Sequence, residues 1–600
     1  MNVKRSISIA VYALLVSTSM ILVTACGSSV PSTAEPVAEP TVATAATVPG
    51  APTIGTATGG NGSVSVSFTA PSSNGDSAIL EYTVSSTPGS ILGSGSGSPI
   101  TVSGLTNGTA YTFTVIATNA VGNSAASSAS NSVTPAAPST ITFSPSSGTI
   151  GTLLTITSSD TDLSGQQGVA VNGVAAIVLS SSTTTITAMV MPQATTGTIS
   201  VTTSAGTTTS TSDFTVSAAS SIANQQGSKL VGTGGSGTAG QGWAVALSAD
   251  GNTAISSGSS DNSNTGAVWV YTRSGTTWTQ QGSKLVGTGA TGSALQGSSV
   301  AISADGNTAA VGGYNDSGNV GAVWVFVRSG ATWSQQGSKL TGSSPVGSSY
   351  QGQSVAISSD GNTLIVGGFG DDSNAGAAWV FTRTGTTWTQ QGSKLVGTGA
   401  SGAAKQGQSV AISADGNTAI VGGLDDNTSA GATWVYTRSG TTWTQQGSKL
   451  VGTGATGAAK QGHSVAISAD GNTAIIGGFV DDSSRGAGWV FTRSGITWTQ
   501  QGSKLTANSV AYQGRSIGLS ADGNTAIIGG DGDTSLVGAV WVYTRSGTTW
   551  TVGSKLIGTG TGSAQPRQGS SCAISADAST VLVGGYGDNS SAGATWVFTP

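Results

Sequence analysis

One unit is repeated seven times in roughly the last 380 residues, and this repetition constrains the fold more than any other feature of the chain. The turn Ser-Ala-Asp-Gly-Asn, or a close variant, marks each unit, and its aspartates follow at intervals of 55, 55, 55, 55, 52 and 55 residues. Self-similarity at such a period is typical of solenoids and propellers. The marker aspartates are Asp250, Asp305, Asp360, Asp415, Asp470, Asp522 and Asp577.

Each unit contains four short β-rich runs. The unit that begins at Gln461 reads QGHSVAIS, TAIIGG, AGWVFTRSG and ITWTQQGSKL, and Asp-Gly, Gly-rich and Ser-Gly turns separate these runs. Four strands joined by tight turns predict one antiparallel propeller blade. Runs such as Val-Ala-Ile and Trp-Val-Phe are apolar on both faces, as expected for a sheet packed between two neighbouring sheets.

The two ends of the repeat region predict a closed ring. The last unit stops after its third strand, and the missing outer strand stands before the first unit, at residues 224–230. One outer strand from the front would complete the seventh blade and leave no open radial edge. The alternative, an open solenoid, would leave half a blade at each end.

The order of motifs in each unit resembles the FG-GAP repeats of integrin-α-type propellers: Gly-x-Ser-Val, Asp-Gly-Asn, Gly-Gly and Gly-Ala-x-Trp-Val. The resemblance implies that the first strand of each blade lines the central channel. The family's calcium loop is shortened here to Ser-Ala-Asp-Gly-Asn-Thr, which has too few oxygen ligands, so calcium is not expected there. A glutamine replaces the family's aromatic residue before the first glycine, as Gln241, Gln296, Gln351, Gln406, Gln461, Gln513 and Gln568.

The amino terminus resembles the lipobox of bacterial lipoproteins. Lys4 and Arg5 precede an apolar run over residues 7–23, which ends in Val-Thr-Ala-Cys-Gly. The resemblance implies a signal peptide over residues 1–25, a lipid anchor on Cys26 and a location in the bacterial cell envelope, at the outer membrane or cell surface. Residues 26–50 lack a periodic apolar face and read as a flexible tether. An ordinary secretory signal or a single membrane-spanning helix is the alternative.

Two further segments alternate apolar and polar residues in short runs, which predicts two Ig-like β-sandwiches. Residues 51–137 resemble a fibronectin type III domain, in which Leu105 and Tyr111 fit the tyrosine corner. Residues 138–217 resemble an IPT/TIG domain. With residues 218–600 as the propeller, the predicted fold is all-β: two Ig-like sandwiches followed by a seven-bladed β-propeller closed by an N-terminal outer strand.

Charge excludes nucleic acid as a partner. Only 8% of residues are charged, the formal net charge is −5, and no Lys or Arg stands between residues 6 and 228. A surface of this kind cannot attract phosphate polymers. One histidine and two cysteines leave no Cys/His zinc cluster, and no cofactor is predicted.

Thirteen of the fourteen tryptophans occupy two fixed positions of the repeat. A residue that every blade contains is usually required by the fold, so packing between blades is the favoured interpretation and a sugar platform the alternative. The strand-3 set is Trp269, Trp324, Trp379, Trp434, Trp489, Trp541 and Trp596, and the strand-4 set is Trp278, Trp333, Trp388, Trp443, Trp498 and Trp550.

The loops between strands 2 and 3 and between strands 4 and 1 share one face of a propeller, and here that face differs between units. Differing residues on a uniform scaffold suit a ligand surface, although neutral drift of loops gives the same pattern. The predicted ligand-binding residues are Trp243, Gln353, Gln408, His463 and Arg515 after the Gln-Gly of strand 1, and Tyr314, Phe369, Phe479 and Tyr586 after the Gly-Gly of strand 2.

The 2–3 loops also carry acidic residues. Paired carboxylates could bind calcium weakly, whereas solvated loop acids are the favoured interpretation. General acid–base catalysis would have to rely on these aspartates alone, because the propeller has one histidine and no glutamate. We therefore expect no enzyme. The weak metal candidates are Asp371, Asp372, Asp425, Asp426, Asp481 and Asp482.

The sequence thus predicts a lipid-anchored envelope protein that presents a propeller for extracellular recognition or adhesion, with a glycan or protein ligand and the membrane as partners. Two alternatives remain: a structural envelope or matrix component without a specific ligand, and a polysaccharide-acting enzyme.

Overall fold

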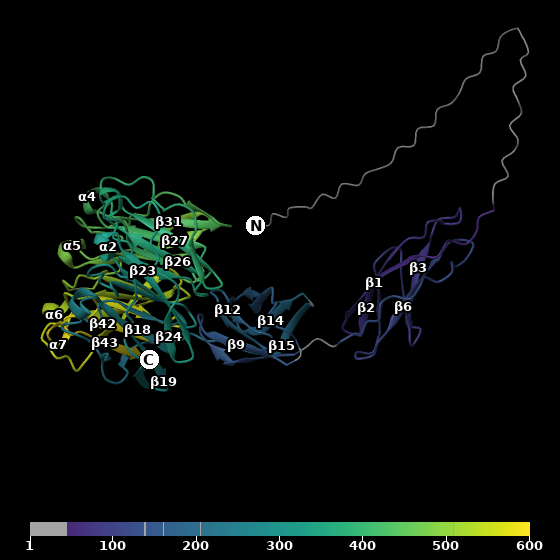
Figure 1. Cartoon of the computed structure of the whole chain (residues 1–600), viewed down its shortest axis with the longest axis horizontal. Helices are drawn as coiled ribbons and strands as arrows, with labels where there is room; N and C mark the ends of the chain where they lie inside the picture. Colours follow the sequence, from purple (N-terminus) through teal and green to yellow (C-terminus); the bar gives the residue numbers. More distant parts are fainter. Residues whose placement is uncertain (1–44, 137–139, 160, 205, 508) are drawn as a thin grey trace, which may run out of the picture. The chain divides into compact units, whose positions relative to one another are not determined.

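A computed structural model describes residues 45–136, 140–159, 161–204, 206–507 and 509–600 (Figure 1). The predicted signal peptide, Cys26 and most of the predicted tether lie outside these residues. The chain divides into two compact units, residues 1–137 and residues 138–600. Within the described residues, no helix is long and apolar enough to cross a membrane.

The first unit is a β-sandwich with two three-stranded sheets, β1-β2-β5 and β4-β3-β6. Val64, Val84 and Phe113 are fully buried between the sheets. The tyrosine corner is present, because the backbone N–H of Thr106 donates to the hydroxyl of Tyr111 at 3.1 Å. The strands are β1 (Thr53–Gly60), β2 (Ser63–Thr69), β3 (Glu81–Thr87), β4 (Leu92–Gly95), β5 (Ile100–Ser103) and β6 (Thr112–Thr118).

The second unit begins with another sandwich, of sheets β12-β13-β9-β7 and β11-β10-β14-β15-β8. Leu154, Ile156 and Phe214 lie in its core. The strands are β7 (Ile141–Ser144), β8 (Ser147–Gly148), β9 (Leu153–Ser158), β10 (Gly168–Val171), β11 (Val174–Ala175), β12 (Ile177–Ser181), β13 (Thr185–Met189), β14 (Gly197–Thr203) and β15 (Gly206–Val216).

The rest of the second unit is a propeller of seven four-stranded antiparallel sheets, six of which are built in sequence order from the inside outward. The inner strands are β17 (Val245–Leu247), β21 (Ser299–Ile302), β25 (Ser354–Ile357), β29 (Gln406–Ile412), β33 (Ser464–Ile467), β37 (Ser516–Leu519) and β41 (Ser571–Ile574). The second strands are β18 (Thr253–Gly258), β22 (Thr308–Gly313), β26 (Thr363–Gly368), β30 (Thr418–Gly423), β34 (Thr473–Gly478), β38 (Thr525–Gly530) and β42 (Val581–Gly585).

The third strands are β19 (Ala267–Ser274), β23 (Ala322–Ser329), β27 (Ala377–Thr384), β31 (Ala432–Ser439), β35 (Ala487–Ser494), β39 (Ala539–Ser546) and β43 (Ala594–Thr599). The outer strands are β20 (Thr277–Gln280), β24 (Thr332–Gln335), β28 (Thr387–Gln390), β32 (Thr442–Gln445), β36 (Thr497–Gln500), β40 (Thr549–Leu556) and, for the seventh blade, β16 (Asn224–Gln225).

The seventh blade confirms the predicted closure. Strand β16 pairs antiparallel with β43, with Asn224 opposite Thr599 and Gln225 opposite Phe598. The N–H of Gln226 continues this ladder by donating to the carbonyl of Val597 at 2.8 Å. The first segment of the propeller is therefore the outer strand of its last blade, and the radial edge is paired.

A closed ring of backbone hydrogen bonds joins the blades at the turns between strands 1 and 2. At each turn, the N–H of one residue donates to the carbonyl of the equivalent residue in the next blade, and the bond from Ala576 to Ala249, at 3.0 Å, closes the circle. The seven residues of this ring are Ala249, Ala304, Ser359, Ala414, Ala469, Ala521 and Ala576.

The second sandwich packs on this ring. Met189 and Met191 share a buried apolar cluster with the ring alanines. The hydroxyl of Thr149 donates to the carbonyl of Asp577 at 2.9 Å, and a Cβ on Gly151 would lie 2.3 Å from the backbone of Ala576. The sandwich therefore covers the centre of one face of the propeller.

The 2–3 loops contain one-turn segments, which lie on the side of the propeller turned away from the second sandwich (Figure 1). Each begins with a buried aspartate, and three consecutive residues follow with positive φ, as in Asn262 (48°), Ser263 (55°) and Asn264 (69°). After glycine, short polar residues tolerate this left-handed conformation best. The segments are α1 (Asp261–Asn264), α2 (Asp316–Asn319), α3 (Asp371–Asn374), α4 (Asp426–Ser429), α5 (Asp481–Ser484), α6 (Asp533–Leu536) and α7 (Asp588–Ser591).

Closure of the ring by β16 predicts a large effect of proline at Gln226. Proline cannot donate to Val597, so Gln226→Pro should lower the free energy of unfolding of the second unit by about 3 kcal/mol. The matched variant Gln226→Ala loses the side-chain contact to Trp278 and keeps the ladder. Urea unfolding followed by tryptophan fluorescence compares the two, and equal stability would contradict a paired seventh blade.

Candidate functional site

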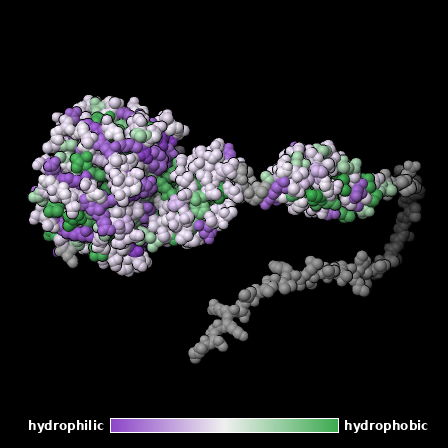
Figure 2. All heavy atoms as spheres, turned by 90° about the horizontal axis from the view of Figure 1, so that it is seen from below, coloured by the Kyte–Doolittle hydropathy of each residue, from purple (hydrophilic) through white to green (hydrophobic). Residues whose placement is uncertain are grey.

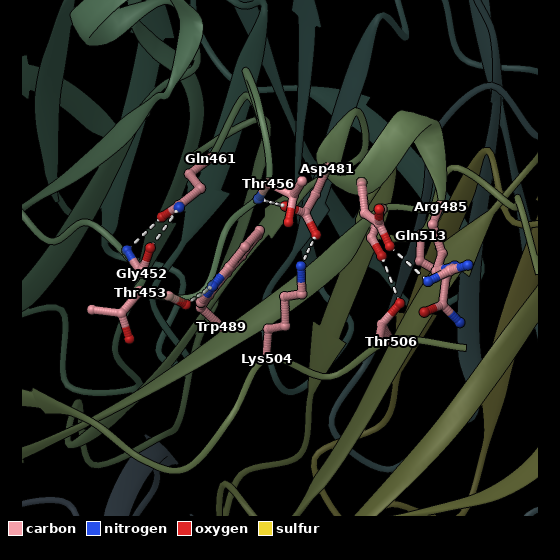
Figure 3. Close-up of polar contacts among 12 residues, drawn as sticks. Gly452, Thr453, Thr456, Gln461, Asp481, Arg485, Trp489, Lys504, Thr506 and Gln513 are labelled. Carbon is pink, nitrogen blue, oxygen red and sulfur yellow. Dashed lines mark hydrogen bonds and ion pairs between the residues drawn. The ribbon is translucent and has the colours of Figure 1, made fainter. Parts of the chain in front are cut away.

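A buried ion pair anchors every 2–3 loop. In blade 5, a carboxylate oxygen of Asp481 accepts from the ammonium of Lys504 at 2.5 Å, and the other oxygen accepts from the N–H of Thr456 at 2.7 Å (Figure 3). Asp481 is fully buried, so the carboxylate connects the 2–3 loop to two 4–1 loops, through Lys504 after β36 and through Thr456 before β33. The equivalent pairs are Asp261–Lys284, Asp316–Lys339, Asp371–Lys394, Asp426–Lys449, Asp533–Lys555 and Asp588–Lys229.

The repeated glutamine and tryptophan fix the 4–1 loop. The Gln461 amide accepts from the N–H of Gly452 at 2.5 Å and donates to its carbonyl at 2.9 Å, while the Trp489 indole donates to the carbonyl of Thr453 at 2.9 Å (Figure 3). A Cβ on Gly452 would lie 2.2 Å from the Trp489 ring, so this position requires glycine. The strand-3 tryptophans are buried, which confirms the packing interpretation.

The outer tryptophans also pack between blades. In blade 5, the Arg493 guanidinium lies 5.4 Å from the Trp498 ring centre, and the Trp498 indole donates to Gln446 of the preceding blade at 2.9 Å. The six arginines in this position are therefore part of the repeated scaffold: Arg273, Arg328, Arg383, Arg438, Arg493 and Arg545.

These ion pairs change the interpretation of the loop acids. Asp371, Asp426 and Asp481 are buried against lysines, so the expectation of solvated carboxylates is wrong for them. A carboxylate that already faces an ammonium is a poor cation ligand. Asp425 contacts Lys405 and Lys460 at 2.9 and 2.8 Å, and Asp482 contacts Arg485 at 2.6 Å. Among the described residues, no three His, Cys, Asp or Glu side chains gather as metal ligands.

The residue before each repeated glutamine has a left-handed backbone, which no sequence motif indicated. Its N–H donates to the last residue of the left-handed turn in the preceding blade, as Lys460 does to Ser429 at 2.9 Å. Holding a non-glycine residue in this conformation costs of order 1–3 kcal/mol. Because its residue type differs between units, this position could have been predicted from the sequence to belong to the ligand surface. Its residues are Gly240, Leu295, Tyr350, Lys405, Lys460, Tyr512 and Arg567.

The predicted ligand residues and these left-handed residues lie together on one face, which we call the variable face. Aromatic rings on it lie in pairs: Tyr350 stacks on Phe369 within blade 3, with ring centres 4.9 Å apart and planes at 4°, and Trp243 of blade 1 lies 5.0 Å from Tyr586 of blade 7. Tyr314 lies 6.1 Å from Tyr350. Trp243 is 40% exposed and the other rings are half-buried.

A third group on the variable face spans blades 5 and 6, and we call it the blade 5–6 cluster: Lys460, His463, Phe479, Tyr512 and Arg515. The His463 and Phe479 ring centres are 4.5 Å apart, and the Arg515 guanidinium lies 5.3 Å from the Phe479 ring centre. Tyr512 meets Phe479 edge-on at 6.5 Å. Gln353 and Gln408, also predicted, are half-buried at the equivalent position of blades 3 and 4.

Burial, with Arg515 and Lys460 nearby, lowers the pKa of His463 to about 3. The imidazole is therefore neutral at physiological pH. Its Nδ1 is buried and has no hydrogen-bond partner among the described residues. A buried ring nitrogen without a hydrogen-bond partner is costly to the folded protein.

The charges that do not repeat are concentrated on the variable face. From residue 224 onward, the lysines of the Asp–Lys pairs and the strand-3 arginines recur in the scaffold. Every other Lys or Arg of this region lies in a 2–3 loop, a 4–1 loop or the entry to strand 1: Lys405, Lys460, Arg485, Arg515 and Arg567. The aspartates outside the marker turns and the Asp–Lys pairs are also on this face: Asp372, Asp425, Asp482 and Asp531.

Figure 2 shows a surface that is largely of intermediate hydropathy, with scattered hydrophilic and hydrophobic areas. A cavity of about 250 Å³ lies in the channel, lined by the leucines and isoleucines that end the inner strands, by the alanine ring and by Met189. This lining places the inner strands at the channel, as the resemblance implied. Met189 lies at the covered end, so the variable face is the open side of the propeller.

Two segments match known families. Residues 50–133 match the fibronectin type III domain, and residues 333–381 match the FG-GAP repeat. The chain contains a fibronectin type III domain and an FG-GAP repeat. Both kinds of domain are typically non-catalytic. No curated protein matches the chain.

Solved structures with similar folds are distant. Hydrazine synthase of Kuenenia stuttgartiensis is 15% identical with a TM-score of 0.38, and the match covers 61% of this chain and 96% of that one. A putative 6-phosphogluconolactonase of Bacteroides fragilis is 14% identical with a TM-score of 0.37, covering 54% and 83%. A putative TolB of Agrobacterium tumefaciens is 12% identical with a TM-score of 0.31, covering 54% and 94%.

The buried Asp–Lys pair should contribute strongly to stability. Lys504→Met leaves the buried Asp481 carboxylate without its counter-ion, so it should lower the free energy of unfolding by about 3 kcal/mol. Restoring neutrality with Asp481→Asn in the same chain should recover most of this loss. The control Arg485→Gln breaks the exposed pair with Asp482 and should cost less than about 1 kcal/mol. Equal losses in urea unfolding would contradict the structural role of the buried pair.

The lowered pKa of His463 predicts a pH-dependent stability. The unfolded chain takes up a proton on this imidazole below about pH 6.5, whereas the folded chain does so only near pH 3. The contribution of neutral His463 to the free energy of unfolding is therefore fully present above pH 6.5 and is lost as the pH falls toward 3. Between pH 7.5 and 4.5, wild type should lose about 1–2 kcal/mol more than His463→Gln. Parallel losses in urea unfolding would show that the imidazole is not enclosed.

Proposed function

We propose that this chain is a lipid-anchored protein of the bacterial cell envelope, which presents its propeller for extracellular recognition or adhesion. Its ligand would be a glycan or a protein, and the variable face would bind it. Cys26 would carry the lipid, and the residues before the first sandwich would form the tether. Fibronectin type III and FG-GAP domains fit a surface-exposed recognition or adhesion role.

One observation carries the proposal. The scaffold of the propeller is nearly identical from blade to blade, and its non-repeating charges lie on the variable face beside exposed and half-buried aromatic rings. Differing side chains on a rigid uniform scaffold are typical of binding surfaces, since the scaffold positions the loops and the loops supply specificity. The second sandwich packs over the centre of the opposite face, which leaves the variable face open.

The proposal does not include catalysis. In the 2–3 loops, the carboxylates that repeat are neutralised by lysines, and a hydrolase would need a free general acid and base within reach of one bond. A released product from any polysaccharide, lost on changing an aspartate pair, would favour the enzyme alternative instead.

The test is a binding screen of the chain from residue 27 onward against arrays of glycans and matrix proteins, first with calcium and then with chelator. We expect a saturable ligand whose binding weakens at least tenfold in Phe479→Ala, Phe369→Ala or Tyr314→Ala, because aromatic anchors dominate such surfaces. The matched control is Ile496→Ala, which removes a 77%-exposed apolar side chain at the turn between strands 3 and 4.

Two results would contradict the proposal. One is the absence of any ligand for a demonstrably folded chain, which would favour a structural envelope component. The other is a ligand whose affinity is equally reduced by Ile496→Ala and by the variable-face substitutions.

A further inference from the structure

The blade 5–6 cluster has an excess of positive charge on a chain whose formal net charge is −5. Arg515 lies over the Phe479 ring, and no carboxylate of the described residues lies within salt-bridge distance of its guanidinium. Lys460 shares the carboxylate of Asp425 with Lys405, so two ammonium groups face one acid. The cluster therefore offers uncompensated positive charge to a ligand.

The histidine in this cluster adds a neutral hydrogen-bonding group. The same two cations disfavour a proton on His463, and its enclosed Nδ1 has no partner among the described side chains and backbone groups. The imidazole therefore stays neutral within the cluster and leaves its positive charge on Arg515 and Lys460.

Aromatic rings beside these groups supply a flat apolar surface. Phe479 and Tyr512 meet edge-on, and the backbone of Tyr512 is held at a φ of 56° by a hydrogen bond from its N–H to Ser484 at 3.0 Å. A pyranose ring has an apolar C–H face that packs on an aromatic ring and polar groups on its rim. The strained backbone fixes the tyrosine before a ligand arrives, which reduces the entropy lost on binding.

We propose that the blade 5–6 cluster binds a carboxylate-bearing saccharide, with the carboxylate on Arg515 and Lys460 and the sugar ring against Phe479 and Tyr512. This inference rests on the proposed function and names the substrate class of that same face. A planar guanidinium binds a carboxylate through two parallel hydrogen bonds, which a single point charge cannot do.

The test measures binding of the chain from residue 27 onward to oligogalacturonate, to its methyl ester, to sulfated galactan and to neutral galactan by calorimetry. We expect oligogalacturonate to bind, its methyl ester and neutral galactan to bind at least tenfold more weakly, and salt to weaken the binding. Arg515→Gln should reduce the affinity at least tenfold. Arg515→Lys should reduce it less, because lysine keeps the positive charge and loses only the two parallel hydrogen bonds of the guanidinium.

The matched control is Arg485→Gln, which removes a cation of the same face that is already paired with Asp482. Unchanged binding in this variant and reduced binding in Arg515→Gln support the assignment, provided that both variants unfold at the wild-type temperature. Equal binding of the methyl ester, preference for sulfated galactan, or no binding of oligogalacturonate would each overturn it. A neutral glycan or a matrix protein that depends on Phe479 would overturn this inference and leave the proposed function in place.

Discussion

Backbone hydrogen bonds between neighbouring blades are the interaction on which the rest of the propeller depends. The alanine ring joins the blades at the 1–2 turns, and the left-handed turns of the 2–3 loops bind the next blade on the opposite face. Each blade must therefore present the same backbone to its neighbour, which explains why the sequence repeats so closely. The ring also has to close, and β16 provides the last strand that closure requires.

A scaffold under this constraint can vary only where a side chain makes no repeated contact. The buried Asp–Lys pairs, the glutamine amides and the strand-3 tryptophans are all engaged between loops and strands, so they recur. The positions whose side chains make no repeated contact are those before and after the Gln-Gly of strand 1 and after the Gly-Gly of strand 2. These positions lie together on the variable face, so the side chains on this face differ from blade to blade.

The sequence predicted the parts of this structure that depend on short-range pattern. The turn residues that recur at a fixed period predicted the seven blades, and the outer strand that stands before the first unit predicted the closed ring. It did not predict that Asp481 is buried, because the lysine that neutralises it lies 23 residues further along, at Lys504. It missed the left-handed Lys460 and Tyr512, since neither residue type suggests positive φ. It also missed the packing of Met189 on the alanine ring, because a contact between domains leaves no periodic signal.

Amide hydrogen exchange of the second unit tests the closed ring most directly. The account predicts that the N–H of Ala576, which bonds across the seam to Ala249, exchanges as slowly as that of Ala414 in the middle of the repeat. The N–H of Gln226 in the closing ladder should be protected to a similar degree. Fast exchange at Ala576 and Gln226 beside slow exchange at Ala414 would show a propeller that is open at the seam, and would contradict the account.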